Sequence, residues 1–179
     1  MRAIISFCVC VTLYPAVAEP SNSRNDAAVD LELDIVGHIS PKCEIQLPNR
    51  AIRVLLNDQP GTEQVGFRLD CNQQMSVVMT SQNGGLEHAS HGRGESFDGF
   101  ANFLPYSATF QVDADGALPV TATSNAMLGG AGGAIGVVPH KAAGSLALAW
   151  NPEQPLVGGT FEDVIEIRVT GAGESEIPR

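Results

Sequence analysis

Hydrophobic and polar residues alternate with period two along much of this chain, as in β-strands with one buried face. The alternation is clearest over Val29–Ile35, where apolar residues alternate with Asp and Glu, and over Phe161–Thr170. Between them, shorter alternating or apolar segments are separated by turn signals rich in Gly, Pro and Asn. Further strands are expected near 52–56, 65–71, 75–80, 106–112, 118–123 and 146–150. The pattern predicts an all-β chain folded as a two-sheet sandwich.

The first 18 residues have the features of an export signal. Arg2 provides a positive charge, Ala3–Leu13 is largely apolar, and Ala16–Ala18 offers the small residues that signal peptidase requires. We therefore expect export through the periplasm, to the cell surface or the extracellular medium. The predicted organisation is a signal peptide at 1–18, a polar leader at 19–28, a sandwich domain at 29–171 and a polar tail at 172–179.

Two cysteines remain after the predicted signal is removed. Cys8 and Cys10 leave with the signal, whereas Cys43 and Cys71 each lie in or beside a strand-like segment. In an exported chain, cysteines in such settings predict a disulfide between neighbouring strands.

The charge balance restricts the classes of partner. The chain has 20 acidic residues against 10 lysines and arginines, a formal net charge of −10. An acidic surface with few lysines argues against nucleic acid and anionic membranes as partners. No segment after the signal is long and apolar enough to span a bilayer, so membrane insertion is not expected.

Candidate chemistry is sparse, and we expect neither catalytic residues nor a cofactor. Glu87, His88, His91 and Glu95 could be read as metal ligands, but they lie among glycines and favour a solvated loop without a metal. The glycine-rich segment Gly129–Gly136 lacks the Lys and Ser/Thr of a phosphate-binding loop and is expected to be a flexible loop.

Four segments, taken together and in this order, resemble the spore coat U family of chaperone–usher pilin-like subunits. They are "LELDIVGHISPKCEI" at Leu31–Ile45, "LDC" at Leu69–Cys71, "LPYSATF" at Leu104–Phe110 and "GGTFEDVIEIRV" at Gly158–Val169. The second contains the position of the second cysteine of the family disulfide, and the fourth is similar to the segment that leads into the family's last strand.

The resemblance implies an immunoglobulin-like sandwich that lacks its final strand and leaves a hydrophobic groove beside the last strand present. Such a subunit would be delivered by a periplasmic chaperone to an usher and joined to other pilin-like subunits by donor-strand exchange. It would be a structural subunit of a secreted surface fibre or coat (a fimbrium or pilus). Inward-facing residues of the last strand would line the groove: Phe161, Ile165, Ile167 and Val169.

The N-terminal residues fit the role of strand donor less well than the last strand fits the role of acceptor. The leader lacks alternating apolar residues, and Val29–Ile35 is close enough to Cys43 to be the domain's own first strand. On this interpretation the chain accepts a strand without being a good donor.

Two alternatives remain open. One is a tip adhesin or small-ligand-binding module that uses the loop Ser81–Asn102, where Phe97, Phe100 and Phe103 form an apolar patch or a buried clamp. The other is a self-complete sandwich in which an internal segment replaces the missing strand.

Overall fold

The computed structural model describes residues 33–48, 51–93, 95 and 98–171. The predicted signal peptide, polar leader and C-terminal tail lie outside the described residues. The chain divides into two units, residues 1–37 and 38–179, and every described strand belongs to the second. No helix within the described ranges has the length and apolar character needed to cross a membrane.

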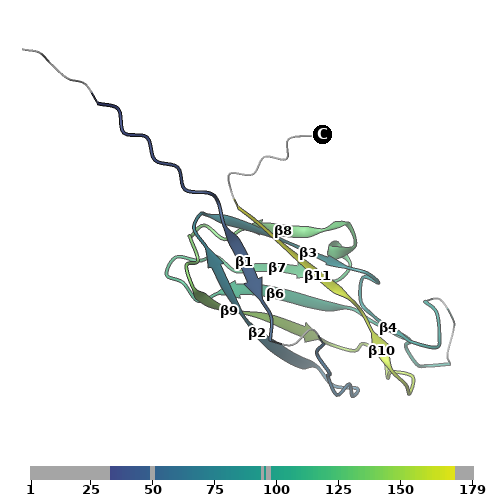
Figure 1. Cartoon of the computed structure of the whole chain (residues 1–179). Coiled ribbons are helices and arrows are strands. Elements are labelled where there is room, and N and C mark those ends of the chain that lie inside the picture. Colours follow the sequence, from purple (N-terminus) through teal and green to yellow (C-terminus); the bar gives the residue numbers. More distant parts are fainter. Residues whose placement is uncertain (1–32, 49–50, 94, 96–97, 172–179) are drawn as a thin grey trace, which may run out of the picture. The chain divides into compact units, whose positions relative to one another are not determined.

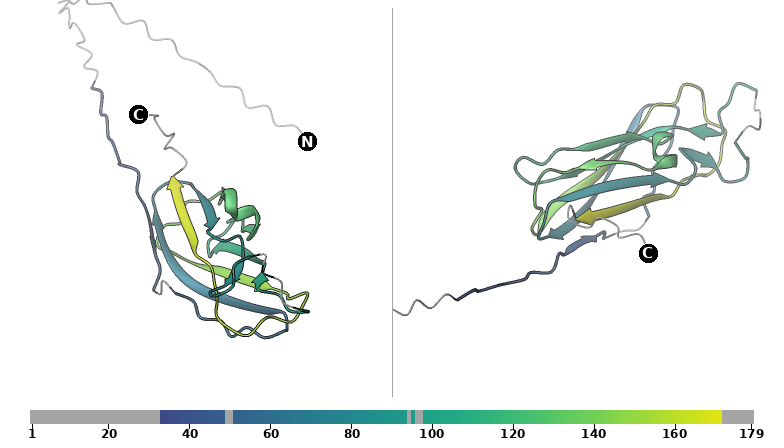
Figure 2. Two further views of the ribbon diagram at one scale, coloured as in Figure 1. Left: turned by 90° about the vertical axis from the view of Figure 1, so that its right-hand side faces the viewer. Right: turned by 90° about the horizontal axis from the view of Figure 1, so that it is seen from above.

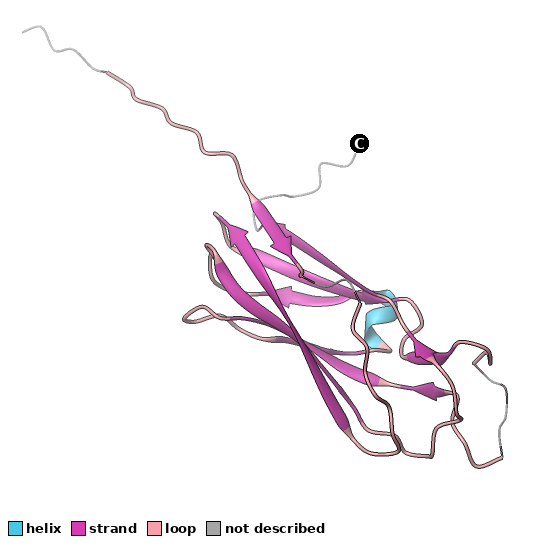
Figure 3. Ribbon diagram, turned by 60° about the horizontal axis from the view of Figure 1, so that its bottom comes forward, coloured by secondary structure: helices cyan, strands magenta, loops and turns pink. Residues whose placement is uncertain are grey.

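The second unit is an all-β sandwich built from antiparallel pairs (Figures 1 and 2). One layer has the strand order β1-β2-β9-β6-β7, and the facing layer has the order β11-β3-β8. A small sheet, β10-β4-β5, continues from the second layer, because β4 follows β3 and β10 precedes β11. The strands are β1 (Cys43–Gln46), β2 (Gly61–Cys71), β3 (Met75–Ser81), β4 (Leu86–His88), β5 (Phe103–Leu104), β6 (Tyr106–Val112), β7 (Val120–Thr123), β8 (Ala131–Ala134), β9 (Ala142–Trp150), β10 (Phe161–Glu162) and β11 (Ile165–Gly171), with a single 3-10 turn at Ala126–Gly129 (Figure 3).

This strand order corresponds to the immunoglobulin arrangement of an A-B-E-D sheet over a C-F-G sheet. The strands β1, β2, β9 and β6 occupy positions A, B, E and D, while β3 and β11 occupy C and F. Within the described residues, no strand occupies position G beside β11. The prediction of an all-β sandwich is confirmed.

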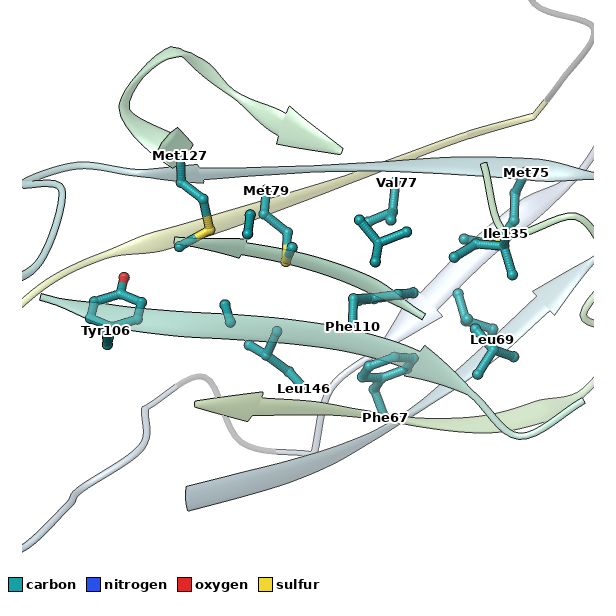
Figure 4. Packing of buried hydrophobic residues seen from close by; sticks show 14 of the residues in the cluster. Phe67, Leu69, Met75, Val77, Met79, Tyr106, Phe110, Met127, Ile135 and Leu146 are labelled. Atoms are coloured by element: carbon teal, nitrogen blue, oxygen red, sulfur yellow. The ribbon is translucent and has the colours of Figure 1, made fainter. Parts of the chain in front are cut away.

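The core forms where the inner faces of the two layers meet (Figure 4). Phe67 of β2 and Phe110 of β6 stack with ring centroids 4.6 Å apart. Val77 and Met79 of β3 cover them from the other layer and are fully buried. Burying each side chain of this kind contributes about 1.5–3 kcal/mol, so these alternating inner faces account for much of the cohesion between the layers.

The segment predicted as the first strand is not part of the sheet where it is described. Leu33, Ile35 and Val36 are 75%, 87% and 92% exposed and have no strand assignment. The register explains the error: Cys43 pairs with Cys71, the last residue of β2, so residues before Cys43 run past the end of their partner strand. The sequence of Val29–Ile35 does alternate, but its described part, residues 33–35, does not form a strand.

The glycine-rich segment also differs from the prediction. Ala131–Ala134 is not a loop but strand β8, which pairs with β3. A Cβ on Gly132 would lie 2.0 Å from the carbonyl oxygen of Val77. Glycine is needed at position 132 because only a residue without a side chain can lie this close to the backbone of β3.

The disulfide between Cys43 and Cys71 is confirmed and joins directly opposed residues of β1 and β2. It lies at the end of the short strand β1, four residues long, where few ladder hydrogen bonds hold the chain. The bond therefore anchors an edge strand that would be weakly held by pairing alone.

We expect Cys43→Ala/Cys71→Ala to lower the free energy of unfolding by about 3–4 kcal/mol, because the bond closes a loop with a sequence separation of 28. Urea denaturation of the oxidised wild type and the double variant measures the difference. The wild type unfolded with a reductant is the control and should match the variant. Identical midpoints for oxidised and reduced protein would contradict the prediction.

Candidate functional site

An apolar groove with a volume of about 300 Å³ runs beside β11, between the two layers of the sandwich. Its floor comes from the inner faces of β2, β6 and β9, and its sides come from β11 and from the chain that follows β1. All but one of its lining residues are apolar or aromatic: Leu47, Ala51, Ile52, Val54, Val65, Leu86, Tyr106, Leu146, Leu148, Trp150, Val164, Ile165 and Ile167, with Asp163 as the exception.

One side of the groove is the free edge of β11. In the described part of the chain β11 pairs with β3 only, so backbone N–H and C=O groups of its other edge lack a strand partner. Its inward residues Ile165 and Ile167 are half-buried, whereas Val77 and Met79 of the neighbouring β3 are fully buried. An open edge with an incompletely covered apolar face is a template for pairing with another strand.

The opposite side is formed by residues 51–56. The sequence pattern predicts a strand here. Ile52, Val54 and Leu56 are indeed half-buried in alternation with exposed neighbours, but the segment is not hydrogen-bonded into a sheet and has no strand assignment. Ile52 and Val54 line the groove. The segment thus has the side-chain pattern of a strand without a backbone partner.

Trp150 closes part of the floor. Its indole lies over Gly61, where a Cβ would come within 2.5 Å of the ring. Gly61 therefore leaves the room that the ring occupies. Within the described residues, the Trp150 Nε1 is a buried donor without a hydrogen-bond partner.

The carboxylate of Asp163 forms the polar end of the groove and links three parts of the fold. Its Oδ2 accepts hydrogen bonds from the hydroxyls of Ser81 and Tyr106, both at 2.5 Å. Its Oδ1 accepts from the backbone N–H groups of Asn83 and Val164, at 2.9 Å and 2.8 Å. Because these partners lie at the end of β3, on β6 and at the start of β11, Asp163 ties the three elements together at this end of the groove.

Tyr106 lies against this carboxylate from the facing layer. Burial, and secondarily the hydrogen bond to Asp163, raise the pKa of its phenol above the ordinary value. Both causes favour the neutral hydroxyl, because ionisation would place a second negative charge beside the carboxylate in a poorly solvated site.

The structure brings together only some of the residues predicted to line the groove. Ile165 and Ile167 line it. Val169 lies on the same face and packs against the core, outside the groove lining. Phe161 belongs to β10, which pairs with β4, and its ring contacts His88 edge-on with centroids 5.2 Å apart. The residues between Phe161 and Ile165 separate β10 from β11, so the two strands pair with different partners. The prediction from alternation alone, which put Phe161 in the groove beside Ile165, is therefore wrong.

Several lining residues were not predicted as part of the site. Ile52 and Val54 had a strand-like pattern in the sequence, and Leu148 and Trp150 alternate in β9. Their periodicity signals an inward face. Which inward residues remain uncovered depends on whether β11 has a second neighbour, and in the part of the chain that the structure describes it has none. No local sequence pattern reveals the pairing of an edge.

The loop that contains His88 and His91 makes hydrogen bonds within itself, unlike the solvated loop predicted from the sequence. His88 is buried, and its Nδ1 accepts a hydrogen bond from the N–H of Ser90 at 3.1 Å. Glu87 accepts from the N–H of Arg93 at 2.7 Å, and His91 Nδ1 lies 3.0 Å from a carboxylate oxygen of Glu95. In the described ranges, no three such side chains are arranged to hold a metal ion.

The two phenylalanines of this loop that the structure describes, Phe100 and Phe103, have different surroundings. Phe103 lies under the guanidinium of Arg93, 3.6 Å from the ring centroid, and packs against Gly85. Phe100 is 50% exposed, and Phe97 lies outside the described residues. Phe103 is therefore part of a clamp that holds the loop.

We expect Tyr106→Phe to lower the free energy of unfolding by about 1.5–3 kcal/mol, because it removes a hydrogen bond to a charged group. Urea denaturation near neutral pH measures the loss. Thr109→Val, on the same strand, removes an exposed hydroxyl pair with Thr121 and serves as the control, with an expected change within about 0.5 kcal/mol.

The same hydrogen bond has a consequence at alkaline pH. The pKa of Tyr106 is raised in the folded state, so the contribution of its neutral hydroxyl to the free energy of unfolding is fully present below the unfolded pKa of about 10. That contribution is lost as the pH rises through the folded-state pKa. The stability gap between wild type and Tyr106→Phe should therefore narrow above that pH. A gap that widens there would contradict the assignment.

No family model matches this sequence, and no curated protein matches it.

Proposed function

We propose that this chain is a structural subunit of a secreted surface fibre or coat, and that its groove receives a β-strand from another chain. The observation that carries the proposal is an edge of β11 that has no strand partner among the described residues, together with an apolar groove directly beside it. Together they provide unpaired backbone groups for a ladder and pockets for alternate side chains, which are the two requirements of strand addition.

The position of the groove supports this proposal. The unoccupied place beside β11 is that of strand G in the immunoglobulin arrangement, where a seventh strand would complete the second layer. An inserted strand would cover Ile165 and Ile167 on one side and contact Ile52 or Val54 on the other. The groove thus has the geometry of a missing structural element.

Export and assembly through other proteins complete the proposal. The confirmed disulfide is compatible with an oxidising compartment outside the cytoplasm. The resemblance to spore coat U and chaperone–usher subunits supports delivery by a periplasmic chaperone and usher, with other pilin-like subunits as final partners. Before assembly, a chaperone would protect the same open edge from unspecific pairing.

We expect a strand-forming peptide, such as one of alternating valine and threonine flanked by lysines, to stabilise the oxidised protein. At a free concentration 100-fold above its dissociation constant, the peptide would add about 2.7 kcal/mol, a rise in melting temperature of about 5–10 °C. Differential scanning fluorimetry measures the shift, and hydrogen exchange should show new protection at Ile165–Gly171.

Ile167→Asp should abolish the effect, because it places a charge in the groove. Thr170→Asp is the matched control, since Thr170 is an outward residue of the same strand, and it should preserve the effect. If every amide of β11 already exchanges slowly in the monomer without peptide, the edge is filled from within its own chain and the proposed function is wrong.

A further inference from the structure

The turn between β3 and β4 contains the one Asn–Gly pair of the sequence, Asn83–Gly84. Such a pair is chemically reactive, because glycine has no side chain to shield its backbone nitrogen from the neighbouring side chain. The nitrogen of the glycine can attack the side-chain carbonyl carbon of the asparagine. The turn is hydrogen-bonded to Asp163 at the end of the groove, but the strand addition proposed above does not involve its reactivity.

We propose that Asn83 is a site of spontaneous deamidation, protected in the folded chain by the hydrogen bonds around Asp163 and released when those bonds open. Hydroxide removes the proton of the Gly84 nitrogen, which then forms a bond to Cγ of Asn83. The Cγ–Nδ2 bond breaks, and ammonia leaves after taking a proton from water, which restores the hydroxide. Water opens the resulting cyclic imide at either carbonyl and leaves aspartate or isoaspartate at position 83.

The attacking atom is protected in the folded state. The backbone N–H of Gly84 donates a hydrogen bond to the hydroxyl oxygen of Ser81 at 2.8 Å, and this bond is buried. Hydroxide cannot remove the proton while the bond is closed and shielded from water. A Cβ at Gly84 would lie 2.8 Å from the side chain of Leu128, so the turn is also closely packed. Attack therefore requires a local opening of the turn.

The asparagine itself is also restrained. Its side-chain Nδ2 donates to the backbone carbonyl of Glu162 at 3.1 Å, and its backbone N–H donates to Oδ1 of Asp163 at 2.9 Å. Its carbonyl oxygen accepts a bond from Nη1 of Arg93 at 3.4 Å. Because two other segments of the chain hold Asn83, fewer side-chain conformations can bring its Cγ to the Gly84 nitrogen.

Ser81 couples these restraints to the rest of the fold. Its hydroxyl accepts the bond from Gly84 and donates to Oδ2 of Asp163 at 2.5 Å, and the residue is only 2% exposed. The same Oδ2 accepts the hydroxyl of Tyr106 from the facing layer. The protection of Asn83 is therefore one part of the network that ties β3, β6 and β11 together. Deamidation marks chains in which that network has opened, whether or not the groove holds a strand.

The modified residue would hinder the network from closing again. The charged residues around the turn include the acids Glu87, Glu162 and Asp163 and the base Arg93. A carboxylate at position 83 adds a negative charge to these mainly acidic surroundings. It also replaces the Nδ2 donor by an oxygen that cannot donate to the carbonyl of Glu162. A transient opening is thereby turned into a lasting one.

The first experiment compares the native protein with the unfolded protein. The full, oxidised chain is kept in mildly alkaline buffer with or without guanidinium chloride, and peptide mapping by mass spectrometry follows conversion at position 83. We expect conversion at least about tenfold slower in the native protein, because the turn must open first. Asn83→Gln is the control and should not convert, since its longer side chain disfavours the cyclic imide. Equal rates in both buffers, or no conversion in guanidinium chloride, would overturn the inference.

The second experiment tests whether the local hydrogen bonds provide the protection. Ser81→Ala should raise the native rate about ten- to hundredfold, because it removes the acceptor of the Gly84 N–H and a hydrogen bond to a charged group. Ser76→Ala, on the same strand, is the matched control and should leave the rate unchanged, since its hydroxyl has no hydrogen-bond partner among the described residues. An unchanged rate in Ser81→Ala would contradict the assignment.

Global unfolding is the competing route, and the disulfide variant separates it from local opening. Cys43→Ala/Cys71→Ala removes no hydrogen bond of the turn, so it should raise the native rate less than about fivefold. A reaction through the unfolded chain would instead accelerate about a hundredfold or more. Any acceleration above about fivefold therefore overturns protection by the local network. This comparison and the first experiment do not depend on whether Ser81→Ala folds.

Discussion

The fold depends on how β11 is held, because within the described residues this strand has only one neighbour. β3 supplies its whole ladder, and the place on the other side of β11 is a groove instead of a strand. A strand paired on one side leaves backbone groups and an apolar face in need of a partner. The sandwich is therefore cohesive in its centre, where Phe67, Phe110 and Met79 are buried, and incomplete at this edge.

Two features compensate for the incomplete edge. At the start of β11, Asp163 accepts four hydrogen bonds and ties the strand to the end of β3 and to Tyr106 in the facing layer. On the other sheet, the disulfide fastens β1 to β2 at the first residue of the strand. Asp163 lines the end of the groove without filling it, whereas the disulfide holds the edge strand β1. The surrounding strands are thus held in position although, in the described part of the chain, the edge of β11 is open.

Sequence patterns located most of the strands and part of the candidate site. Alternation in Tyr106–Val112 and Ile165–Gly171 identified the inward faces, and in the structure Ile165 and Ile167 line the groove. Period two failed for Phe161, because the chain leaves the ladder before β11 begins. It also failed for the glycine-rich strand β8, where the absence of side chains hides the alternation although close approach to β3 demands glycine.

The sequence by itself determined most of the strand-forming segments, the residues that share a face within each of them, and the two cysteines available for a bond. Those properties are local, since they follow from the geometry of neighbouring residues along one strand. Only the tertiary structure decided which edges are paired. It showed that residues 33–35 lie outside the sheet, that 51–56 forms a groove wall, and that Asp163 meets Tyr106 and Ser81. These outcomes depend on the register between segments far apart in the chain, and that register is set when two layers compete for the same buried space.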